Sequence, residues 1–505
     1  MKSAFTILSR VLPGALYVWF ALAGVVFILT SVKTIFFPFA LEQNEGVVLY
    51  VTRLIQEGTL PYMHLTHPPY FINNYPPVYN VLCAVTGYLF SYPLASGRLI
   101  STLSLLGTAI ICGLMTYRLA RSYMWGIICG GFFLTLPMIL WQCRYYRVDA
   151  LGVFFSISAV FAILLIDKKR VPVVVSALLC ALGVFTKHSM LAAPLAIGTV
   201  LFLYRHQYKW LFTCTFLASV TVPAVILQIV SHGEFLRHLF LYTVTGLCTP
   251  DIKRHVMPLI SLIIWYAGAM VFCLTRRNKS AWPMNTALIF IYGLLSLNGV
   301  LLIFKEGASN MYLIEAVAAT IVMGGYAWRS LIQDTRWKNT AACAVFATVL
   351  LSAMMPWFIG SAPYYRIAMG YGTFLSELYS REKEIYLKVK SAQGRVLCEN
   401  ISYPALCGKD PEWVAFMTKQ LHNRGINSDD AIRSLIRSKE FALIVLESAL
   451  RVENNRVIVS AAQLSQLTPG IMQDTLQNYY MRAGESYVPA TPGRYVKQKT
   501  ILYPR

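Results

Sequence analysis

The sequence predicts a mainly α-helical protein that crosses a membrane many times and carries a small α/β domain at its C-terminal end. Of its 505 residues, 56% are hydrophobic and only 13% are charged, whereas a soluble protein carries about a quarter charged residues. The mean hydropathy is +0.54, and long apolar runs are separated by short basic clusters. This composition excludes an ordinary cytosolic enzyme and a disordered chain.

The net charge of +21 fits a membrane protein in which Lys and Arg accumulate in cytoplasmic loops. The basic residues are scattered between the apolar runs and form no single face, so we expect no nucleic acid partner. The eleven cysteines show no CxxC or Cys/His clustering, and the sequence therefore gives no support for a zinc site.

Eleven apolar runs are candidate membrane spans. The first follows the basic residues Lys2 and Arg10 and lacks a small-residue cleavage site, so we interpret it as an uncleaved span with a cytoplasmic N-terminus. Two of the runs, 171–186 and 189–204, are short for a core of about 30 Å and could instead form a re-entrant pair. The eleven runs lie near residues 11–32, 99–117, 123–140, 150–166, 171–186, 189–204, 210–230, 256–275, 284–304, 312–327 and 340–359.

Loop charge decides how to interpret a further apolar run at 78–92. If this run does not span, one set of loops holds 13 Lys/Arg in 31 residues and the opposite set holds 9 in 90. If it did span, every later basic loop would move to the outer side, against the positive-inside rule. The sequence therefore predicts an interfacial or re-entrant helix at 78–92, with the long loop 33–77 and the tail beyond 361 outside the cytoplasm.

The tail differs in composition from the rest of the chain, and we divide the chain into a transmembrane domain, 1–360, and a soluble domain, 361–505. The tail mixes strand-like runs with amphipathic stretches, which predicts a small α/β domain. Its strands are expected at 394–398 and 441–446, its helices at 411–423 and 429–438, and a terminal hairpin near 479–503. Cys398 and Cys407 could form a disulfide in an oxidising compartment or remain two free thiols.

The first outer loop carries two acidic residues, Glu42 and Glu45, before a stretch at 46–57 that is amphipathic enough to lie along the membrane surface. If that region is helical, the two glutamates share a face at the end of the first span. They could serve as catalytic carboxylates, or they could be solvated or cap the surface helix. The paired prolines that follow His67 and Tyr75 predict a rigid interfacial loop, in which His67 has a structural role on the residues alone.

A second group of charges lies at the boundaries of later spans. Arg147 and Asp149 precede the run at 150–166, and Lys187 ends the run at 171–186. Arg147 and Asp149 could form a plain ion pair, and Lys187 could extend along the interface. Ionisable residues packed at span ends are nevertheless candidates for a functional site, and lysine and arginine are suited to bind phosphate oxygens.

These motifs, in this order, resemble the GT-C superfamily of polytopic membrane glycosyltransferases. The sequence is similar to the protein O-mannosyltransferases, to the lipid A aminoarabinose transferases and above all to the bacterial RgtA/B/C/D-like proteins. The resemblance covers most of the chain. Its motifs are Glu42–Gly46, Leu49-Tyr50, Arg53-Leu54, Gly58 with Tyr62, Pro68–Tyr70, Tyr75–Tyr79, Arg98-Leu99, Arg147 with Asp149, Thr186-Lys187 with Pro194, and the segment from Gly307 through Asn310 and Tyr312 to Glu315.

The resemblance implies an enzyme that moves a sugar from a polyprenyl-phosphate carrier to an acceptor outside the membrane, usually with inversion of the anomeric centre. It implies a carboxylate as general base, for which Glu45 is the first candidate by its spacing to Gly58 and Glu42 the second, with Asp149 as an orienting residue. It also implies a substrate site of seven residues: Arg147, Lys187, His67, Tyr75, Asn310, Tyr312 and Glu315.

One position departs from the family pattern. Where the O-mannosyltransferases carry Asp-Glu, this chain has Asn44 and Glu45, so the aspartate of that pair is absent. The choice between Glu45 and Glu42 as base stays open. No organic cofactor is expected, and a divalent cation stays open because the superfamily has members with and without one.

The resemblance places the protein in a bacterial inner membrane, with the lipid bilayer, a polyprenyl-phosphate-linked sugar and a cell-envelope glycan, lipid or protein acceptor as its partners. Two other functions remain in view. A lipid-linked sugar transporter or flippase would share the spans and the acidic residues, but the long first loop, the missing internal repeat and the outer domain count against it. A non-catalytic subunit of a polysaccharide assembly machine would be consistent with Asn44.

Overall fold

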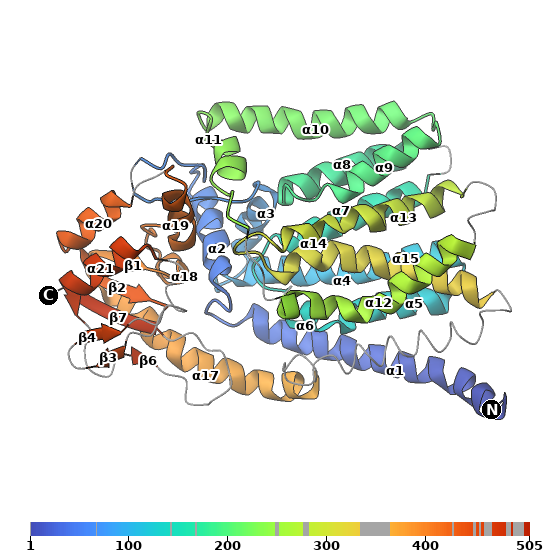
Figure 1. The fold of residues 1–505 in the computed structure, drawn as a ribbon, viewed down its shortest axis with the longest axis horizontal. Coiled ribbons are helices and arrows are strands. Elements are labelled where there is room, and N and C mark those ends of the chain that lie inside the picture. The colour runs from blue at the N-terminus through green and yellow to red at the C-terminus, as the bar shows by residue number, and fades with distance from the viewer. Residues whose placement is uncertain are drawn as a thin grey trace.

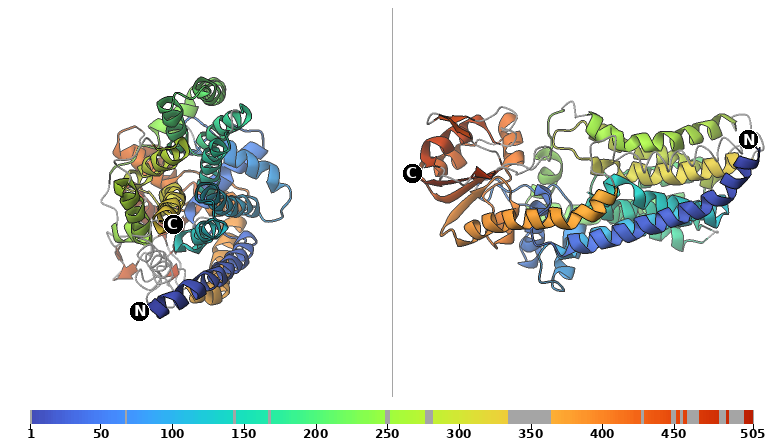
Figure 2. Two further views of the ribbon diagram at one scale, coloured as in Figure 1. Left: turned by 90° about the vertical axis from the view of Figure 1, so that its right-hand side faces the viewer. Right: turned by 90° about the horizontal axis from the view of Figure 1, so that it is seen from below.

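The computed structural model consists of an elongated helical bundle with an α/β unit at one end (Figure 1). The N-terminus lies at the far end of the bundle and the C-terminus in the α/β unit, which Figure 2 shows from two further sides. The structure describes residues 2–504 except 67, 142–143, 167–168, 248–251, 276–281, 334–363, 427–428, 448–450, 454–455, 459–466, 481–485 and 488–498.

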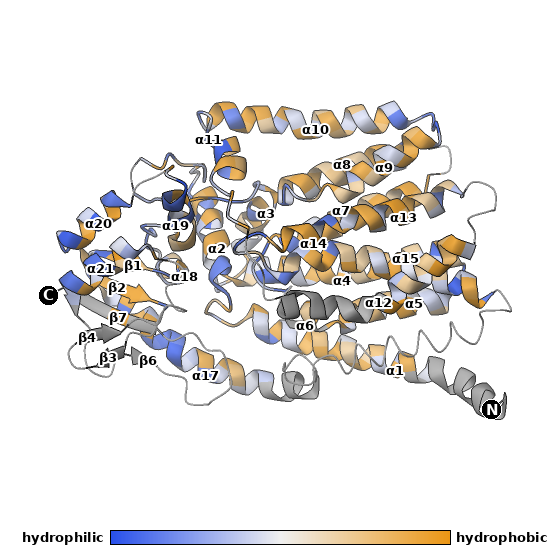
Figure 3. Cartoon of the chain, in the orientation of Figure 1, coloured by the Kyte–Doolittle hydropathy of each residue, from blue (hydrophilic) through white to orange (hydrophobic). Residues whose placement is uncertain are grey.

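The bundle is built from helices that consist largely of apolar residues (Figure 3). Five segments are long and apolar enough to cross a membrane, namely Leu16–Ile35, Ala95–Ala120, Lys209–Val230, Met284–Leu302 and Asn310–Ile332. The bundle elements are α1 (Lys2–Ile35), α4 (Ala95–Ala120), α5 (Tyr123–Thr135), α6 (Pro137–Trp141), α7 (Asp149–Leu164), α8 (Val171–Thr186), α9 (Ala192–Leu203), α10 (Lys209–Val230), α12 (Ile252–Thr275), α13 (Met284–Ser296), α14 (Asn298–Leu302), the 3₁₀ helix η2 (Asn310–Leu313) and α15 (Ile314–Ile332).

The sequence therefore predicted a polytopic helical protein correctly, whereas its count of eleven spans is not established. Several predicted spans are helices of fewer than 18 residues, such as α7, α8 and α9. The predicted span 340–359 lies outside the described residues. The run 78–92 contains only α3 (Val78–Gly87), a helix about 15 Å long, which is too short to cross a core of about 30 Å.

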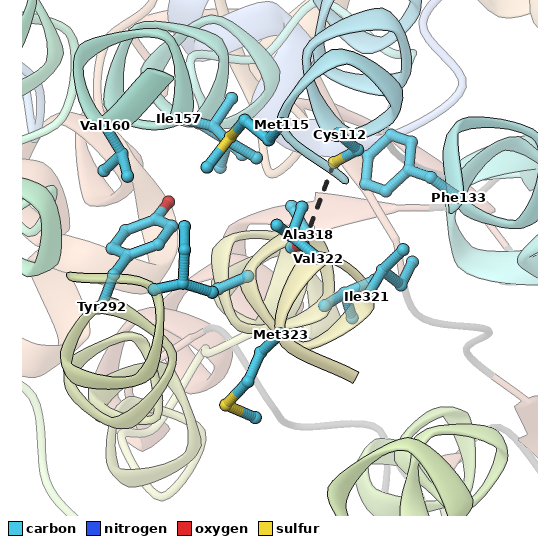
Figure 4. Close-up of a cluster of buried hydrophobic side chains, with 14 of the residues drawn as sticks. Cys112, Met115, Phe133, Ile157, Val160, Tyr292, Ala318, Ile321, Val322 and Met323 are labelled. Atoms are coloured by element: carbon cyan, nitrogen blue, oxygen red, sulfur yellow. Dashed lines mark hydrogen bonds between the residues drawn. The ribbon is translucent and has the colours of Figure 1, made fainter. Parts of the chain in front are cut away.

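Helix α15 is the most buried of the long apolar segments, because α4, α5, α7, α12 and α13 pack around it. Figure 4 shows part of this packing, in which the Cys112 thiol lies 3.9 Å from the carbonyl oxygen of Ala318. Small residues allow α4 and α5 to approach closely: a Cβ atom on Gly113 would lie 2.9 Å from the carbonyl oxygen of Gly126. Such close approach by small residues is typical of helix packing in membranes.

The first predicted outer loop folds into α2 (Gln43–Gln56) and α3 at one end of the bundle, which we call the α2 end. The sequence placed the stretch 46–57 along the membrane surface, but α2 is buried along most of its length. It packs against α3 on one side and against α18 (Ser402–Leu406) of the α/β unit on another. The amphipathic pattern thus reflects burial between two parts of the protein.

A fully buried ion pair fixes α2 to the bundle. Nε and Nη2 of Arg98 in α4 donate to the two carboxylate oxygens of Glu45 at 2.8 and 2.7 Å, and both side chains are 0% exposed. The remaining guanidinium donors bind the backbone carbonyls of Thr34, Phe37 and Phe39 at the end of α1. One pair of side chains therefore holds α1, α2 and α4 together.

The α/β unit contains a sheet in the order β1 (Arg395–Cys398), β2 (Phe441–Leu446), β7 (Lys499–Pro504) and β5 (Tyr479–Tyr480), with β6 (Ser486–Tyr487) also paired to β7. The pair β1–β2 is parallel and the pairs of β7 are antiparallel. A separate hairpin joins β3 (Arg451–Glu453) to β4 (Arg456–Ile458). The helices are α17 (Tyr364–Ser391), α18, α19 (Ala415–Asn423), α20 (Asp430–Arg437) and α21 (Pro469–Asn478).

The strands and helices expected in the tail are thus confirmed at close to their predicted bounds, including the terminal pairing of Tyr479 with Pro504. Cys398 and Cys407 are not joined in a disulfide. The division at 360/361 lies outside the described residues and stays a prediction.

The α/β unit docks directly on α2. Gly46 lies against Ser402 so closely that a Cβ atom there would meet the Ser402 backbone at 2.5 Å. The Gln43 amide donates to the carbonyl oxygen of Glu399 at 2.8 Å, and Arg53 pairs with Asp410 at 3.0 Å. The position of α2 is therefore set from both sides, by the bundle and by the α/β unit.

We predict that Glu45→Gln and Arg98→Met each lower the thermal unfolding temperature strongly. Removing one partner of a buried ion pair leaves an unpaired buried charge, which costs about 3–5 kcal/mol. The measurement is a thermal melt of the purified protein in detergent. The control is Glu57→Gln, which breaks the more exposed pair between Arg53 and Glu57 and should cost below about 1 kcal/mol. Equal melting temperatures for Glu45→Gln and Glu57→Gln would contradict this prediction.

Candidate active site

Four charged side chains form a continuous chain at the α2 end of the bundle. Nη1 of Arg147 donates to both carboxylate oxygens of Glu42, at 2.6 and 2.8 Å. Nε of Arg147 lies 3.1 Å from Oδ2 of Asp149, and Nζ of Lys187 lies 2.6 Å from Oδ1 of Asp149. We call these residues the charge chain.

Helix termini bring the charge chain together. Glu42 is the N-cap of α2, Asp149 begins α7, and Lys187 is the C-cap of α8. A carboxylate at a helix N-terminus and an ammonium at a C-terminus both complement the helix dipole. Because α7 and α8 are antiparallel neighbours, the start of one and the end of the other meet at the same end of the bundle.

The members of the charge chain differ in their access to solvent. The side chains of Arg147, Asp149 and Lys187 are 6%, 1% and 3% exposed, whereas that of Glu42 is 29% exposed. Burial works against the charge of Arg147, but Glu42 and Asp149 outweigh it and raise the pKa of the guanidinium well above its ordinary value. The site thus presents one accessible carboxylate beside the buried side chains of Arg147 and Lys187.

Two tyrosines predicted as substrate-binding residues lie at the charge chain. The ammonium of Lys187 is 3.8 Å from the ring centroid of Tyr312, a cation–π contact. Tyr75 interacts electrostatically with Arg147, Asp149 and Tyr312, and desolvation raises the pKa of its hydroxyl. The Tyr75 hydroxyl therefore stays protonated and can donate a hydrogen bond.

Lys305 adds a further positive charge that the sequence analysis did not assign to the site. It is half-buried, and among the described residues its ammonium makes no ion pair. Burial and the neighbouring charge of Lys187 lower its pKa. Burial, then Lys187 and Lys305, also lower the pKa of His188 to about 4, so this imidazole is neutral at pH 7. Lys305 lies 118 positions beyond Lys187, and no spacing rule could have paired them.

Glu45, the first candidate for the base, is bound by partners outside the charge chain. Its two oxygens accept from Arg98 and from the backbone N–H groups of Leu41 and Tyr146, at 2.6 and 2.7 Å. Glu42 adopts an extended backbone conformation, with φ −145° and ψ 146°, outside the helix that contains Glu45. The two glutamates therefore do not share a helix face.

The remaining predicted site residues are spread more widely. Asn310 opens η2, two residues before Tyr312. Glu315 is buried in the first turn of α15, where it accepts from the hydroxyls of Ser156 and Tyr292. His67 lies outside the described residues.

Among the described residues, no group of three or more His, Cys, Asp or Glu side chains is arranged to hold a metal ion. The two carboxylates of the charge chain are already bound by cations, Glu42 by Arg147 and Asp149 by both Arg147 and Lys187.

Comparison with known proteins shows a likeness in structure only, since no family model and no curated protein matches the sequence. ArnT from Cupriavidus metallidurans, in a crystal structure with undecaprenyl phosphate, superposes with a TM-score of 0.59 at 12% identity, over 96% of this chain and 97% of ArnT.

Two further solved structures are similar. The Archaeoglobus fulgidus oligosaccharyltransferase AglB, in complex with an inhibitory peptide and a dolichol-phosphate, has a TM-score of 0.51 at 10% identity, over 85% of this chain and 69% of AglB. The mycobacterial arabinofuranosyltransferase AftD has a TM-score of 0.50 at 14% identity, over 96% of this chain and 41% of AftD. Nearly the whole chain therefore has the fold of the GT-C membrane glycosyltransferases.

Proposed function

We propose that this protein is a glycosyltransferase that moves a sugar from a polyprenyl-phosphate carrier to an acceptor outside the cytoplasm. The observation that carries the proposal is the pairing of one accessible carboxylate, Glu42, with buried cations in a GT-C fold. The structures of ArnT with undecaprenyl phosphate and of AglB with dolichol-phosphate support a polyprenyl phosphate as ligand.

In the proposed reaction the acceptor hydroxyl oxygen attacks the anomeric carbon while the bond from that carbon to the phosphate oxygen breaks. The bonding electrons pass to the phosphate, which gains a negative charge, and the hydroxyl proton passes to the Glu42 carboxylate. Attack opposite the leaving phosphate inverts the anomeric centre. The sugar is thereby transferred and the polyprenyl phosphate is released.

Glu42 has a better claim to the base role than Glu45 because of their surroundings. Glu42 is partly exposed and bound by a single cationic side chain, Arg147, which a phosphate could engage in its place. Glu45 is fully buried, and each of its oxygens already accepts from Arg98 and from a backbone N–H group. A role as base would require Glu45 to abandon the interactions that hold three helices together.

The cations have the complementary task of holding the phosphate. Arg147 and Lys187 can donate charge-assisted hydrogen bonds to its oxygens, and Lys305 supplies a further charge as the leaving group develops. Asp149 binds both Arg147 and Lys187 and so orients them.

We assign the remaining candidates to the substrate site as well. Tyr75 would donate its hydroxyl hydrogen, and Tyr312 would support Lys187. Asn310, Glu315 and His67 would line the same site. Both carboxylates of the charge chain are bound by basic side chains. A divalent cation at this site would therefore need further ligands, from the phosphate of the sugar donor or from the acceptor molecule.

The arrangement across the membrane is part of the proposal. We place the α2 end and the soluble domain, 361–505, outside the cytoplasm and the transmembrane domain, 1–360, in a bacterial inner membrane. The N-terminus then lies in the cytoplasm. The basic-loop asymmetry supports this orientation.

We predict that Glu42→Gln lowers the transfer rate by about a hundredfold to ten-thousandfold, because it removes the general base while preserving shape. The assay is transfer from a synthetic polyprenyl-phosphate sugar in detergent, with folding checked by a thermal melt. The matched control is Glu57→Gln at the other end of α2, which should retain activity. Normal turnover by a folded Glu42→Gln variant would exclude Glu42 as the base, and an inactive wild type would favour the assembly-subunit function.

We predict that Lys187→Ala and Lys305→Ala each weaken donor binding by about tenfold or more. A charge-assisted hydrogen bond to phosphate is worth about 1.5–3 kcal/mol. Binding is measured by titration with a synthetic polyprenyl-phosphate sugar. Lys209→Ala is the control, since Lys209 also lies over an aromatic ring, that of Phe202, but it begins α10 and is remote from the site. Donor affinity unchanged in both site variants would contradict the phosphate assignment.

We predict that single cysteines at positions 57 and 423 react with an impermeant thiol reagent in intact cells, whereas a cysteine at position 205 reacts only after permeabilisation. All three native side chains are exposed, so accessibility depends on the side of the membrane alone. The measurement uses a background without the native cysteines. The reverse labelling pattern would overturn the orientation.

A further inference from the structure

A buried histidine outside the charge chain makes two specific contacts with the first loop. His238 lies in the π-helical turn η1 (Arg237–Leu241), which follows the short helix α11 (Glu234–Leu236). Its Nδ1 accepts the backbone N–H of Asn73 at 3.0 Å, and its Nε2 lies 2.8 Å from the carbonyl oxygen of Met63. Because one partner is a donor and the other an acceptor, the contacts require a neutral imidazole with its hydrogen on Nε2.

The segment held by His238 leads directly to a site residue. The Asn73 side-chain oxygen accepts the backbone N–H of Tyr75 at 3.2 Å. From the other side, the Tyr62 hydroxyl donates to the Tyr75 carbonyl oxygen at 3.1 Å, and the Tyr62 ring packs edge-on against His238 with centroids 5.8 Å apart. The backbone of Tyr75 is thus fixed on both sides by a network that contains His238.

We infer that His238 is a positioning residue, which holds the loop so that Tyr75 faces Arg147 and Asp149. The inference rests on the proposed function only for its effect on transfer, since the attachment of the loop is a property of the free protein. His238 lies 163 residues beyond Tyr75 in sequence. In the part of the chain that the structure describes, its ring nitrogens bond to Asn73 and Met63 and not to the charge chain.

The two contacts make the attachment sensitive to acid. Protonation would place a hydrogen on Nδ1, opposite the N–H of Asn73, and two donors cannot bond to each other. The neutral form is the binding form, so the attachment is present at neutral pH and is lost as the pH falls through the pKa of His238. Burial lowers that pKa below its ordinary value, which keeps the loop attached at neutral pH.

Other charged groups face this region. Glu234 is buried and binds three partners: His64 at 3.0 Å, Arg237 at 2.8 Å and the Tyr242 hydroxyl at 3.1 Å. The negative charge of Glu234 raises the pKa of His238, while a charged His64 lowers it. Both effects are smaller than that of burial. Any acid response must therefore be separated from protonation of His64.

Two conservative variants separate the two contacts. His238→Asn places an amide oxygen near the position of Nδ1 and keeps an acceptor for Asn73. His238→Gln places its amide near the position of Nε2 and keeps only a donor for Met63. His206→Asn is the matched control, because Nδ1 of His206 also accepts a backbone N–H, that of Tyr208 at 3.3 Å, in the loop between α9 and α10.

The first measurement is hydrogen–deuterium exchange of the peptide covering residues 71–76, expressed as protection relative to intrinsic exchange. In the wild type we expect protection to fall about tenfold on acidification, at a pH where the core of α4 is still protected. His238→Gln should lose that protection already at neutral pH, and His238→Asn should retain it without the acid response. His64→Asn and His206→Asn should behave as the wild type.

Protection of 71–76 that is independent of pH in the wild type would overturn the inference, even if the variants fail to fold. An acid response abolished by His64→Asn and retained in His238→Asn would overturn it as well. In the transfer assay, His238→Gln should lower kcat about tenfold or more with little change in the donor KM, and His238→Asn should restore it. If the wild type transfers no sugar, the proposed function fails while the exchange experiment still decides the role of His238.

Discussion

The buried pair of Glu45 with Arg98 is the interaction on which the α2 end of the molecule depends. A charged pair without exposure to solvent is stable only when its remaining hydrogen-bonding groups are satisfied. Here three carbonyls at the end of α1 and two backbone N–H groups complete the bonding of the pair. These bonds fix where α2 begins. They thereby place Glu42, three residues before Glu45, at the partly exposed end of the charge chain.

The charge chain meets a second physical requirement. Basic side chains buried in an apolar bundle need negatively charged partners. Asp149 binds one basic side chain with each of its two oxygens, so Arg147 and Lys187 each have a carboxylate partner at low solvent exposure. Glu42, which is acidic, and Lys305, which is basic, are more exposed to solvent than Arg147, Asp149 and Lys187. Such a site is suited to a reaction in which a proton reaches a carboxylate while charge builds up on a nearby phosphate.

The α/β unit takes part in this arrangement through α2. Its helix α18 packs on the same helix that Arg98 holds from the bundle side, and the contact at Gly46 leaves no room for a side chain. Arg424, just beyond α19, donates to the carbonyls of Leu241 and Val244 and so contacts the turn that carries His238. The unit therefore restrains both segments that position the site.

The sequence by itself determined the helical membrane character and several of the tail elements, because hydropathy and strand patterns are local properties of the chain. Charges at span ends are local as well, and they made Arg147, Asp149 and Lys187 candidates for the site. It did not determine the number of spans or the burial of α2. It also placed the two glutamates on one helix face, since an interval of three residues on a helix implies one face, and the family resemblance ranked Glu45 before Glu42 as the base. Only the tertiary structure separated them: Glu42 is the extended N-cap, and Arg98, 53 residues beyond Glu45, draws Glu45 inward. The tertiary structure alone also brings Lys305 near Lys187 and binds His238 to the first loop. Long-range packing joins these groups, and no local sequence pattern relates them.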